Sequence, residues 1–259
     1  MEPAEILQEV ALQVADCQKC GLHFSRKCSV PGEGPNEVEI LLIGEGPGFY
    51  ENEQGRPFVG QAGKLLDDLL LKGGLKREQV FITNVVKCRP PGNRDPLPEE
   101  LSACATYLDR QIEALNPAVI VTLGRFSMAK FLPNVRISDV HGKPVTLHGR
   151  LIVPMYHPAA ALHQPGLRPA LEADFSHLPE FIQQVQKNHS PVAAPTGEVK
   201  TVAPTIPIQV AALSLDFEAR PDPSAGMTES SPTAVESWED NQPTSNPPED
   251  DNPVQLSLF

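Results

Sequence analysis

The sequence predicts an α/β domain with a mainly parallel sheet and helices on both faces, followed by a disordered tail. Over residues 1–187, short apolar runs that stop at glycine or a polar residue alternate with amphipathic segments, as buried strands and covering helices do. Residues 188–259 contain 11 of the 28 prolines, 2 basic residues and 11 acidic residues. A segment of that composition buries too little apolar surface to offset the entropy of ordering it.

The predicted elements follow one another along the chain. A first helix is expected over residues 5–15, where apolar residues recur at helical spacing. Four strands are expected, at residues 38–44 (VEILLIG), 80–86 (VFITNVV), 118–124 (AVIVTLG) and 151–157 (LIVPMYH). Further helices are expected at residues 62–71, 98–115, 125–131 and 170–186. Ligands of such sheets bind beyond the carboxyl ends of the strands. The site should therefore include GEGPG (44–48), residues from Asn84 onward, the residues after Leu123, and His157 with Pro158.

Most of the net charge belongs to the tail. The formal charge of −12 divides into −3 for residues 1–187, with 19 basic and 22 acidic residues, and −9 for residues 188–259. The N-terminus lacks the basic start and apolar core of a signal peptide, and no uncharged apolar run reaches the roughly 18 residues that span a bilayer. We therefore expect a cytoplasmic protein, whose five cysteines are ligands, buried thiols or catalytic groups rather than disulfides.

Four of the five cysteines form a possible ligand set, namely Cys17, Cys20, Cys88 and Cys104. The first two form a C-x2-C pair, from which two thiolates can reach one metal site from a single turn. The spacing leaves three interpretations open: a tetrahedral zinc site, a [4Fe–4S] cluster and buried free thiols. Cys28 is expected to stand outside the set, and His23 is an alternative ligand.

Polar and aromatic residues follow the predicted strands. Glu45, Glu51 and Phe58 combine two carboxylates with an aromatic ring near backbone N–H groups, which suits chemistry on a flat polar ring. Asn84 offers a donor and an acceptor side by side, the complement of a base edge. His157 ends the last strand. The alternatives are solvated loop charges, a turn cap and a structural histidine.

Basic residues lie near these positions although the domain is slightly acidic. Lys87, Arg89 and Arg94 share one loop, and Arg168 lies in another. Local clusters of this kind position phosphates without a basic overall charge, so these residues are DNA-contact candidates. A solubilising surface is the competing explanation.

Taken in order, the motifs resemble the family 4 uracil-DNA glycosylases, the iron–sulfur type. The matching segments are the four-cysteine set, GEGPGFYENEQGRPFVGQAGKLL, FITNVVKCRPPGNRDPLPEE and MYHPAAAL. The resemblance covers roughly residues 4–187 and implies a DNA-repair glycosylase that flips uracil out of DNA and hydrolyses its N-glycosidic bond. It also implies a three-layer α/β/α fold with a four-stranded mainly parallel sheet, and a structural [4Fe–4S] cluster, not zinc, on Cys17, Cys20, Cys88 and Cys104.

The resemblance assigns roles to single positions. Glu45, Gly46 and Pro47 lie in the first active-site motif, and Phe58 stacks on uracil. Asn84 hydrogen-bonds the uracil edge, and His157 faces the O2 oxygen.

One feature leaves the catalytic assignment open. In the best-known uracil-glycosylase family an Asp follows the residue that matches Glu45, whereas Gly46 stands here, so Glu45 or Glu51 would have to replace the water-activating carboxylate. The loop of Glu51 is also expected to exclude the methyl group of thymine. Residues 162–168, from Leu162 to Arg168, are a candidate wedge for the vacated base stack, and a compact surface turn is the alternative.

Two alternative functions remain after this comparison of motifs. One is a related glycosylase that prefers another deaminated base, such as hypoxanthine or xanthine, or that cross-links to its abasic product. The other is a non-catalytic iron–sulfur or zinc module that binds DNA and recruits partners through the tail. The preference for single- or double-stranded DNA stays open, and a monomer is expected.

The tail ends in QLSLF, residues 255–259, after a predicted linker at residues 188–254. This pentapeptide resembles the Q-L-x-L-F peptide by which bacterial replication and repair proteins bind the sliding clamp. The resemblance implies that Leu256, Leu258 and Phe259 fill an apolar pocket while Gln255 anchors a neighbouring one.

Overall fold

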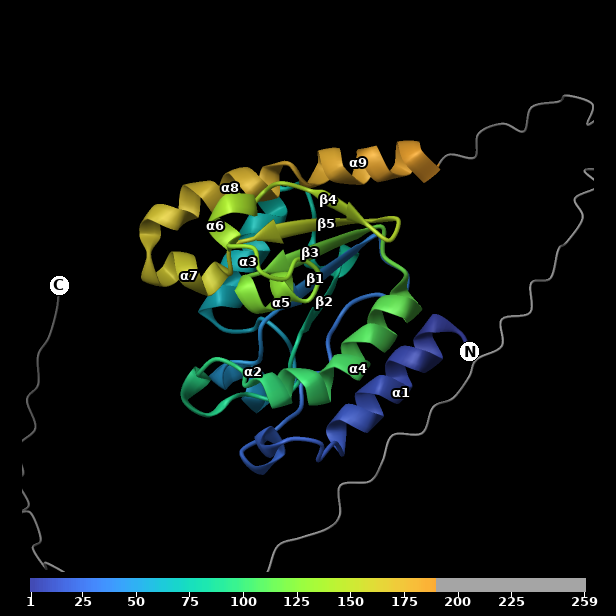
Figure 1. Cartoon of the computed structure of the whole chain (residues 1–259), viewed down its shortest axis with the longest axis vertical. Coiled ribbons are helices and arrows are strands. Elements are labelled where there is room, and N and C mark those ends of the chain that lie inside the picture. Colours follow the sequence, from blue (N-terminus) through green and yellow to red (C-terminus); the bar gives the residue numbers. More distant parts are fainter. Residues whose placement is uncertain (190–259) are drawn as a thin grey trace, which may run out of the picture. The chain divides into compact units, whose positions relative to one another are not determined.

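A mixed, mostly parallel sheet forms the centre of the computed structural model, which describes residues 1–189 (Figure 1). The strands, in the spatial order β2-β1-β3-β5-β4, are β1 (Ile40–Gly44), β2 (Phe81–Asn84), β3 (Val119–Leu123), β4 (Val145–Leu147) and β5 (Arg150–Met155). The four predicted strands are confirmed, and β2, β1, β3 and β5 are parallel. Residues 190–254 of the predicted linker and QLSLF lie outside the described residues, whereas residues 188–189 belong to the last helix.

The sheet has five strands, whereas four were predicted. β4 pairs antiparallel with β5 at the edge of the sheet, with Leu147 opposite Arg150. Between them His148 and Gly149 both have positive φ, 49° and 77°, as a tight two-residue hairpin turn requires. β4 has three residues, of which Val145 and Thr146 are exposed, so its sequence lacks the apolar run that identified the other strands.

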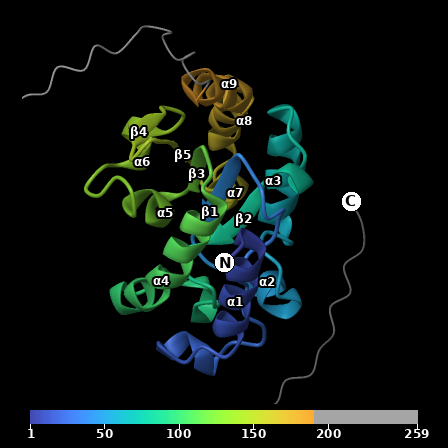
Figure 2. The ribbon, with the colours of Figure 1, turned by 90° about the vertical axis from the view of Figure 1, so that its right-hand side faces the viewer.

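Helices cover both faces of the sheet, as the views in Figures 1 and 2 show. One face packs against α1 (Pro3–Ala15) and α4 (Pro98–Leu115), and its core includes Leu41 and Ile43 of β1. The opposite face packs against α3 (Gln61–Lys72), α7 (Pro158–His163), α8 (Arg168–Ser176) and α9 (Leu178–His189). Because strand side chains alternate between faces, Ile40 and Leu42 belong to this second core. The predicted α/β/α layering is confirmed.

The boundaries of the helices follow from local signals. α4 begins with a proline, and the Glu100 carboxylate accepts a 2.8 Å hydrogen bond from the Leu97 N–H, satisfying a free donor at the helix start. It ends at Leu115, and the capping residue Asn116 has a φ of 40°. The single helix predicted at 170–186 is instead two helices, because the chain turns at His177.

The remaining helical segments are short. They are α2 (Phe49–Gln54), α5 (Arg125–Ala129), α6 (Ile137–Val140) and the 3-10 turns η1 (Gly21–Phe24), η2 (Arg77–Gln79), η3 (Pro91–Asn93) and η4 (Pro165–Leu167). Among the described residues, no helix combines the length and the apolarity needed to cross a membrane.

Candidate active site

A cavity of about 530 Å³ opens at the edge where the parallel strands end. Its lining comes from the segment after β1, from the turn before α3, from the end of β2, from the loop after it and from α7. It contains every residue predicted to bind uracil, namely Glu45, Gly46, Pro47, Phe58, Asn84 and His157, and also Glu51. The volume lies within the range of about 300–1,000 Å³ that is usual for small-molecule sites.

Asn84 presents an unsatisfied acceptor to this cavity. The residue is 1% exposed, and its side-chain oxygen Oδ1 has no hydrogen-bond partner among the described residues. The side chain of Asn84 lies against Gly44. A Cβ added at Gly44 would lie 2.4 Å from Asn84 Oδ1 and 2.7 Å from the ring of Phe58. A buried acceptor without a partner is costly, so this atom is placed to receive a donor from a ligand.

Phe58 and His157 form the aromatic part of the cavity. Their rings lie roughly parallel, with centroids 5.5 Å apart and an interplanar angle of 27°. Phe58 is 6% exposed and has a φ of 51°, which phenylalanine rarely adopts. Its ring is therefore held in one place by a constrained backbone.

His157 is held as a neutral donor. It precedes α7, and its Nδ1 accepts a 3.1 Å hydrogen bond from the Ala159 N–H, so the ring proton is on Nε2. Burial lowers the pKa of His157 to about 4, against a smaller opposing effect of the Glu51 carboxylate. At neutral pH the imidazole therefore donates an N–H without carrying a charge.

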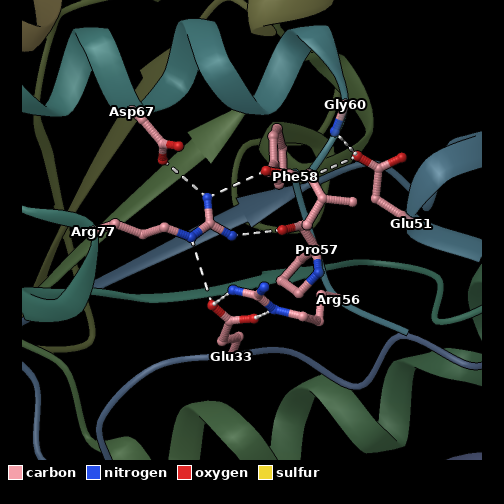
Figure 3. Close-up of polar contacts among 9 residues, drawn as sticks. Glu33, Glu51, Arg56, Pro57, Phe58, Gly60, Asp67 and Arg77 are labelled. Carbon is pink, nitrogen blue, oxygen red and sulfur yellow. Dashed lines mark hydrogen bonds and ion pairs between the residues drawn. The ribbon is translucent and has the colours of Figure 1, made fainter. Parts of the chain in front are cut away.

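The two candidate carboxylates have different surroundings. Glu51 accepts hydrogen bonds from the N–H groups of Gly48, Val59 and Gly60 at 3.1, 2.9 and 3.0 Å, and Figure 3 shows it beside the Phe58 segment. The carboxylate of Glu45 has no hydrogen-bond partner in the described part of the chain. Burial and then Asp95 raise the pKa of Glu45, while Arg125 opposes them. Glu45 is thus the carboxylate that is free to act on a ligand or water.

The four predicted ligand cysteines line one small cavity. Cys17 and Cys20 come from the segment between α1 and η1, Cys88 follows β2, and Cys104 lies on α4. His23 lines this cavity as well, but its Nδ1 lies 2.7 Å from the Cys20 carbonyl oxygen. The structure separates Cys28 from the set, because its Sγ is directed to the Glu53 carbonyl at 3.7 Å.

The four cysteines are a possible ligand set for a metal centre. The side chains of residues 1–189 do not by themselves form a group of three or more ligands for one metal ion. The sulfur atoms nevertheless have the N–H donors that thiolate ligands need: Arg26 Nη1 lies 3.4 Å from Cys88 Sγ, and the Lys87 N–H lies 3.3 Å from Cys104 Sγ. Four cysteines around one shared space match the ligand set of a [4Fe–4S] cluster.

The structure corrects the prediction that Lys87 contacts DNA. The residue is 1% exposed, and its Nζ donates to Thr83 Oγ1, the Asn84 carbonyl and Gln111 Oε1 at 2.6, 2.9 and 2.6 Å. Burial lowers its pKa to about 7. Lys87 therefore supports the backbone of Asn84 from within and cannot reach a phosphate.

The other DNA-contact candidates lie closer to the surface. Arg94 lines the mouth of the cavity and pairs with Glu100, while the guanidinium of Arg89 lies 5.3 Å from the ring centroid of Phe49. Leu162, on α7, is 42% exposed. Arg168 is exposed at the start of α8 and pairs with Glu172. These four positions are compatible with DNA contact, which stays a prediction.

Sequence reasoning placed Gly44 in the site but missed Asn93 and Arg77. Gly44 leaves room for Asn84 and Phe58, and Asn93 lines the cavity. Arg77 reaches the backbone of Phe58 from η2 (Figure 3). A glycine at the end of a buried strand was a usable signal for Gly44, whereas nothing in the local pattern distinguishes Arg77 from a solvated charge.

The chain is similar to known proteins over this whole domain. Residues 31–185 match the model of the uracil DNA glycosylase superfamily. A type-4 uracil-DNA glycosylase from Archaeoglobus fulgidus is 46% identical over 192 residues, which cover 70% of this chain and 96% of that protein. Those from Saccharolobus solfataricus and Thermotoga maritima are 50% and 43% identical, over 68% and 70% of this chain and over 86% and 96% of their own lengths.

Proposed function

The chain belongs to the uracil DNA glycosylase superfamily, among its type-4 members, and from this premise we infer that it excises uracil from DNA. It is a hydrolase of DNA repair that breaks the N-glycosidic bond between uracil and deoxyribose and leaves an abasic site. A base inside a duplex cannot reach the cavity, so the nucleotide must be flipped out, at a cost of a few kcal/mol that is smallest for an unpaired or mispaired uracil.

The observation that best supports this function is the unpartnered Oδ1 of Asn84. In uracil the N3–H can donate to Oδ1 while the O4 oxygen accepts from the side-chain amide. Cytosine presents an unprotonated N3 and an amino group at the same positions, so both contacts become repulsive. Such a polar mismatch in a closed pocket discriminates by several orders of magnitude.

We assign the chemical step to His157 and Glu45. As the bond breaks, negative charge develops on uracil, and the neutral Nε2–H of His157 can stabilise it at O2, as oxyanion-hole donors do. Glu45 is the better candidate for orienting water or stabilising the sugar cation, because the Glu51 carboxylate is already occupied by three backbone N–H groups. Phe58 offsets part of the cost of base flipping by stacking on the base.

The uracil-release rate should depend on pH through Glu45. Glu45 acts in its ionised form, and its pKa is raised above the ordinary 4.5. The rate should therefore fall as the pH drops through this raised pKa. His157 stays neutral there, because its pKa is about 4. Single-turnover rates between pH 4 and 9 should show this acid limb, and Glu45→Gln should lower the rate about 100-fold and remove the limb.

Asp95→Asn is the matched control for this pH dependence. Asp95 raises the pKa of Glu45 from outside the cavity, so the substitution should move the acid limb to lower pH with little change in the maximal rate. An acid limb that persists unchanged in Glu45→Gln would assign the titration to another group.

We propose that Cys17, Cys20, Cys88 and Cys104 hold a [4Fe–4S] cluster. The shared cavity and the N–H donors to Cys88 and Cys104 support this proposal. When bound, such a cluster would link the segment after α1, the segment after β2 and α4 by Fe–S bonds, which is a structural role. The cavity lies apart from the residues assigned to the chemical step.

One assay tests the proposed function. The purified protein is incubated with oligonucleotides that contain uracil, hypoxanthine, xanthine or thymine, single- or double-stranded, and abasic sites are then measured by alkaline cleavage. Abasic sites at uracil confirm the function, and a faster reaction at another deaminated base favours the related specificity. DNA binding without any base release favours a non-catalytic module. The absorbance of the same sample near 400 nm reports the cluster.

We also propose that QLSLF, residues 255–259, binds a bacterial sliding clamp. Support comes from the Q-L-x-L-F pattern and its position at the end of an acidic, proline-rich segment. The composition of residues 188–254 predicts a linker with an r.m.s. span of about 40–50 Å. Such a tether gives effective concentrations of up to about millimolar, so a weak peptide contact would keep the enzyme near newly copied DNA. The cytoplasmic location and the monomeric state stay predictions.

Removing residues 255–259 should abolish co-purification with a bacterial sliding clamp and leave uracil release unchanged. Phe259→Ala should weaken clamp binding at least tenfold in a titration, because the aromatic ring is expected to fill the apolar pocket. Ser257→Ala is the matched control, since this position is variable in the motif. Clamp binding that survives the truncation would exclude QLSLF as the contact.

A further inference from the structure

The backbone at Phe58 is held in a conformation that phenylalanine does not adopt by itself. Its φ of 51° lies in the left-handed region, where a side chain larger than glycine is strained. The residue is not at a free loop tip, because it is buried and its ring lines the active-site cavity. Some neighbouring group must therefore hold this conformation.

Arg77 binds the carbonyl groups of the Phe58 segment (Figure 3). Its Nη2 donates to the Pro57 carbonyl at 2.6 Å, and its Nη1 donates to the Phe58 carbonyl at 3.2 Å. Two carboxylates orient the guanidinium: Asp67 of α3 accepts from Nη1 at 3.0 Å, and Glu33 lies 3.6 Å from Nε. The side chain is only 16% exposed, so these bonds are largely shielded from water.

The opposite side of the segment is equally constrained. The Glu51 carboxylate accepts from the N–H groups of Val59 and Gly60, directly after Phe58. Gly63 of α3 lies against the Phe58 carbonyl, where an added Cβ would come within 1.8 Å of the oxygen. The peptide groups on both sides of Phe58 are thus fixed by charged side chains.

We propose that Arg77 is a positioning residue for uracil recognition, which acts by holding the Phe58 ring in the plane where it stacks on the flipped base. This role rests on the proposed function, because it is defined by the contact between Phe58 and uracil. An arginine suits it because its planar fork can bind two successive carbonyls and two carboxylates at once, whereas the single ammonium of a lysine cannot.

Arg77→Met should lower the maximal single-turnover rate of uracil release about 30-fold, the effect of a loosened stacking ring on a geometry-sensitive step. The enzyme concentration for half-maximal rate should change less than threefold, because Arg77 contacts the backbone of Phe58 and does not line the cavity. Arg77→Lys should fall between the wild type and Arg77→Met.

Arg56→Met is the matched control. Arg56 is the neighbouring arginine on the same Glu33 carboxylate, with bonds of 2.6 and 2.8 Å, but it makes no side-chain hydrogen bond to the described Phe58 segment. We expect its rate to stay within threefold of the wild type. The melting temperatures of all variants separate a general loss of stability from a specific effect on the rate.

A double-mutant cycle decides whether Arg77 acts through Phe58. In a Phe58→Leu background Arg77→Met should cost less than about threefold, because the ring that it positions is gone. Equal losses in both backgrounds, or a loss that Arg56→Met reproduces, would overturn the role of Arg77 while leaving the glycosylase function intact. A wild-type protein that releases no uracil would overturn both.

Discussion

Asn84→Ala is expected to lower the single-turnover rate of uracil release about 1,000-fold, with the melting temperature nearly unchanged. The substitution removes the acceptor for N3–H and the donor for O4 from a site that is 1% exposed, where water compensates poorly. Stability should be preserved because Oδ1 has no partner among the described residues that would be left unpaired. The rate is measured with excess enzyme on a uracil-containing oligonucleotide.

Asn84→Asp is the matched comparison, because it retains the size of the side chain. Its carboxylate faces the O4 oxygen of uracil with a second acceptor, so uracil release should again fall, while the amino group of cytosine finds an acceptor. The ratio of cytosine to uracil release should therefore rise. If Asn84→Ala, Glu45→Ala and His157→Ala all released uracil at the wild-type rate, this cavity would not be the active site.

The architecture was largely predictable because each strand of the parallel sheet is buried on both faces. Such strands are continuous apolar runs, and each end of β1, β2, β3 and β5 was located within two residues. β4 was not predicted, because an exposed edge strand of three residues has no such apolar run. The sequence predicted one helix in place of α8 and α9, because the amphipathic pattern continues across His177.

The site was predictable to the extent that topology determines it. Parallel strands end at one edge, so residues after β1, β2 and β5 had to meet, and Glu45, Asn84 and His157 do line one cavity. Topology does not reveal whether a side chain in a loop turns inward or outward. Lys87 therefore looked like a DNA contact although it is buried beneath Asn84, and no local pattern indicated that Arg77 binds the backbone of Phe58.

The cysteine cavity connects segments that the sheet does not hold together. Its lining combines the end of α1, η1, the segment after β2 and α4, with Val14, Leu22 and Tyr107 packed around the four thiols. This core is small, and its segments come from distant parts of the sequence. A small core of that kind depends on cross-links for stability more than the sheet does.

Cys88→Ser is expected to abolish the absorbance near 400 nm and to lower the melting temperature by more than about 10 °C. A structural metal centre contributes directly to the free energy of folding, and a loss of 5 kcal/mol or more shifts the melting temperature by roughly 10–20 °C in a domain of this size. Uracil release at 20 °C should fall in proportion to the fraction of unfolded protein, because the cysteines do not line the active-site cavity.

Cys28→Ser provides the matched control, since Cys28 is half-buried like Cys17 and Cys20 but lies outside their cavity. Its absorbance, iron content and melting temperature should equal those of the wild type. Iron and sulfide assays on both variants distinguish the cluster from zinc, which would leave the protein colourless. Full colour in Cys88→Ser, or loss of colour in Cys28→Ser, would contradict the proposed ligand set, because that set includes Cys88 and leaves Cys28 outside.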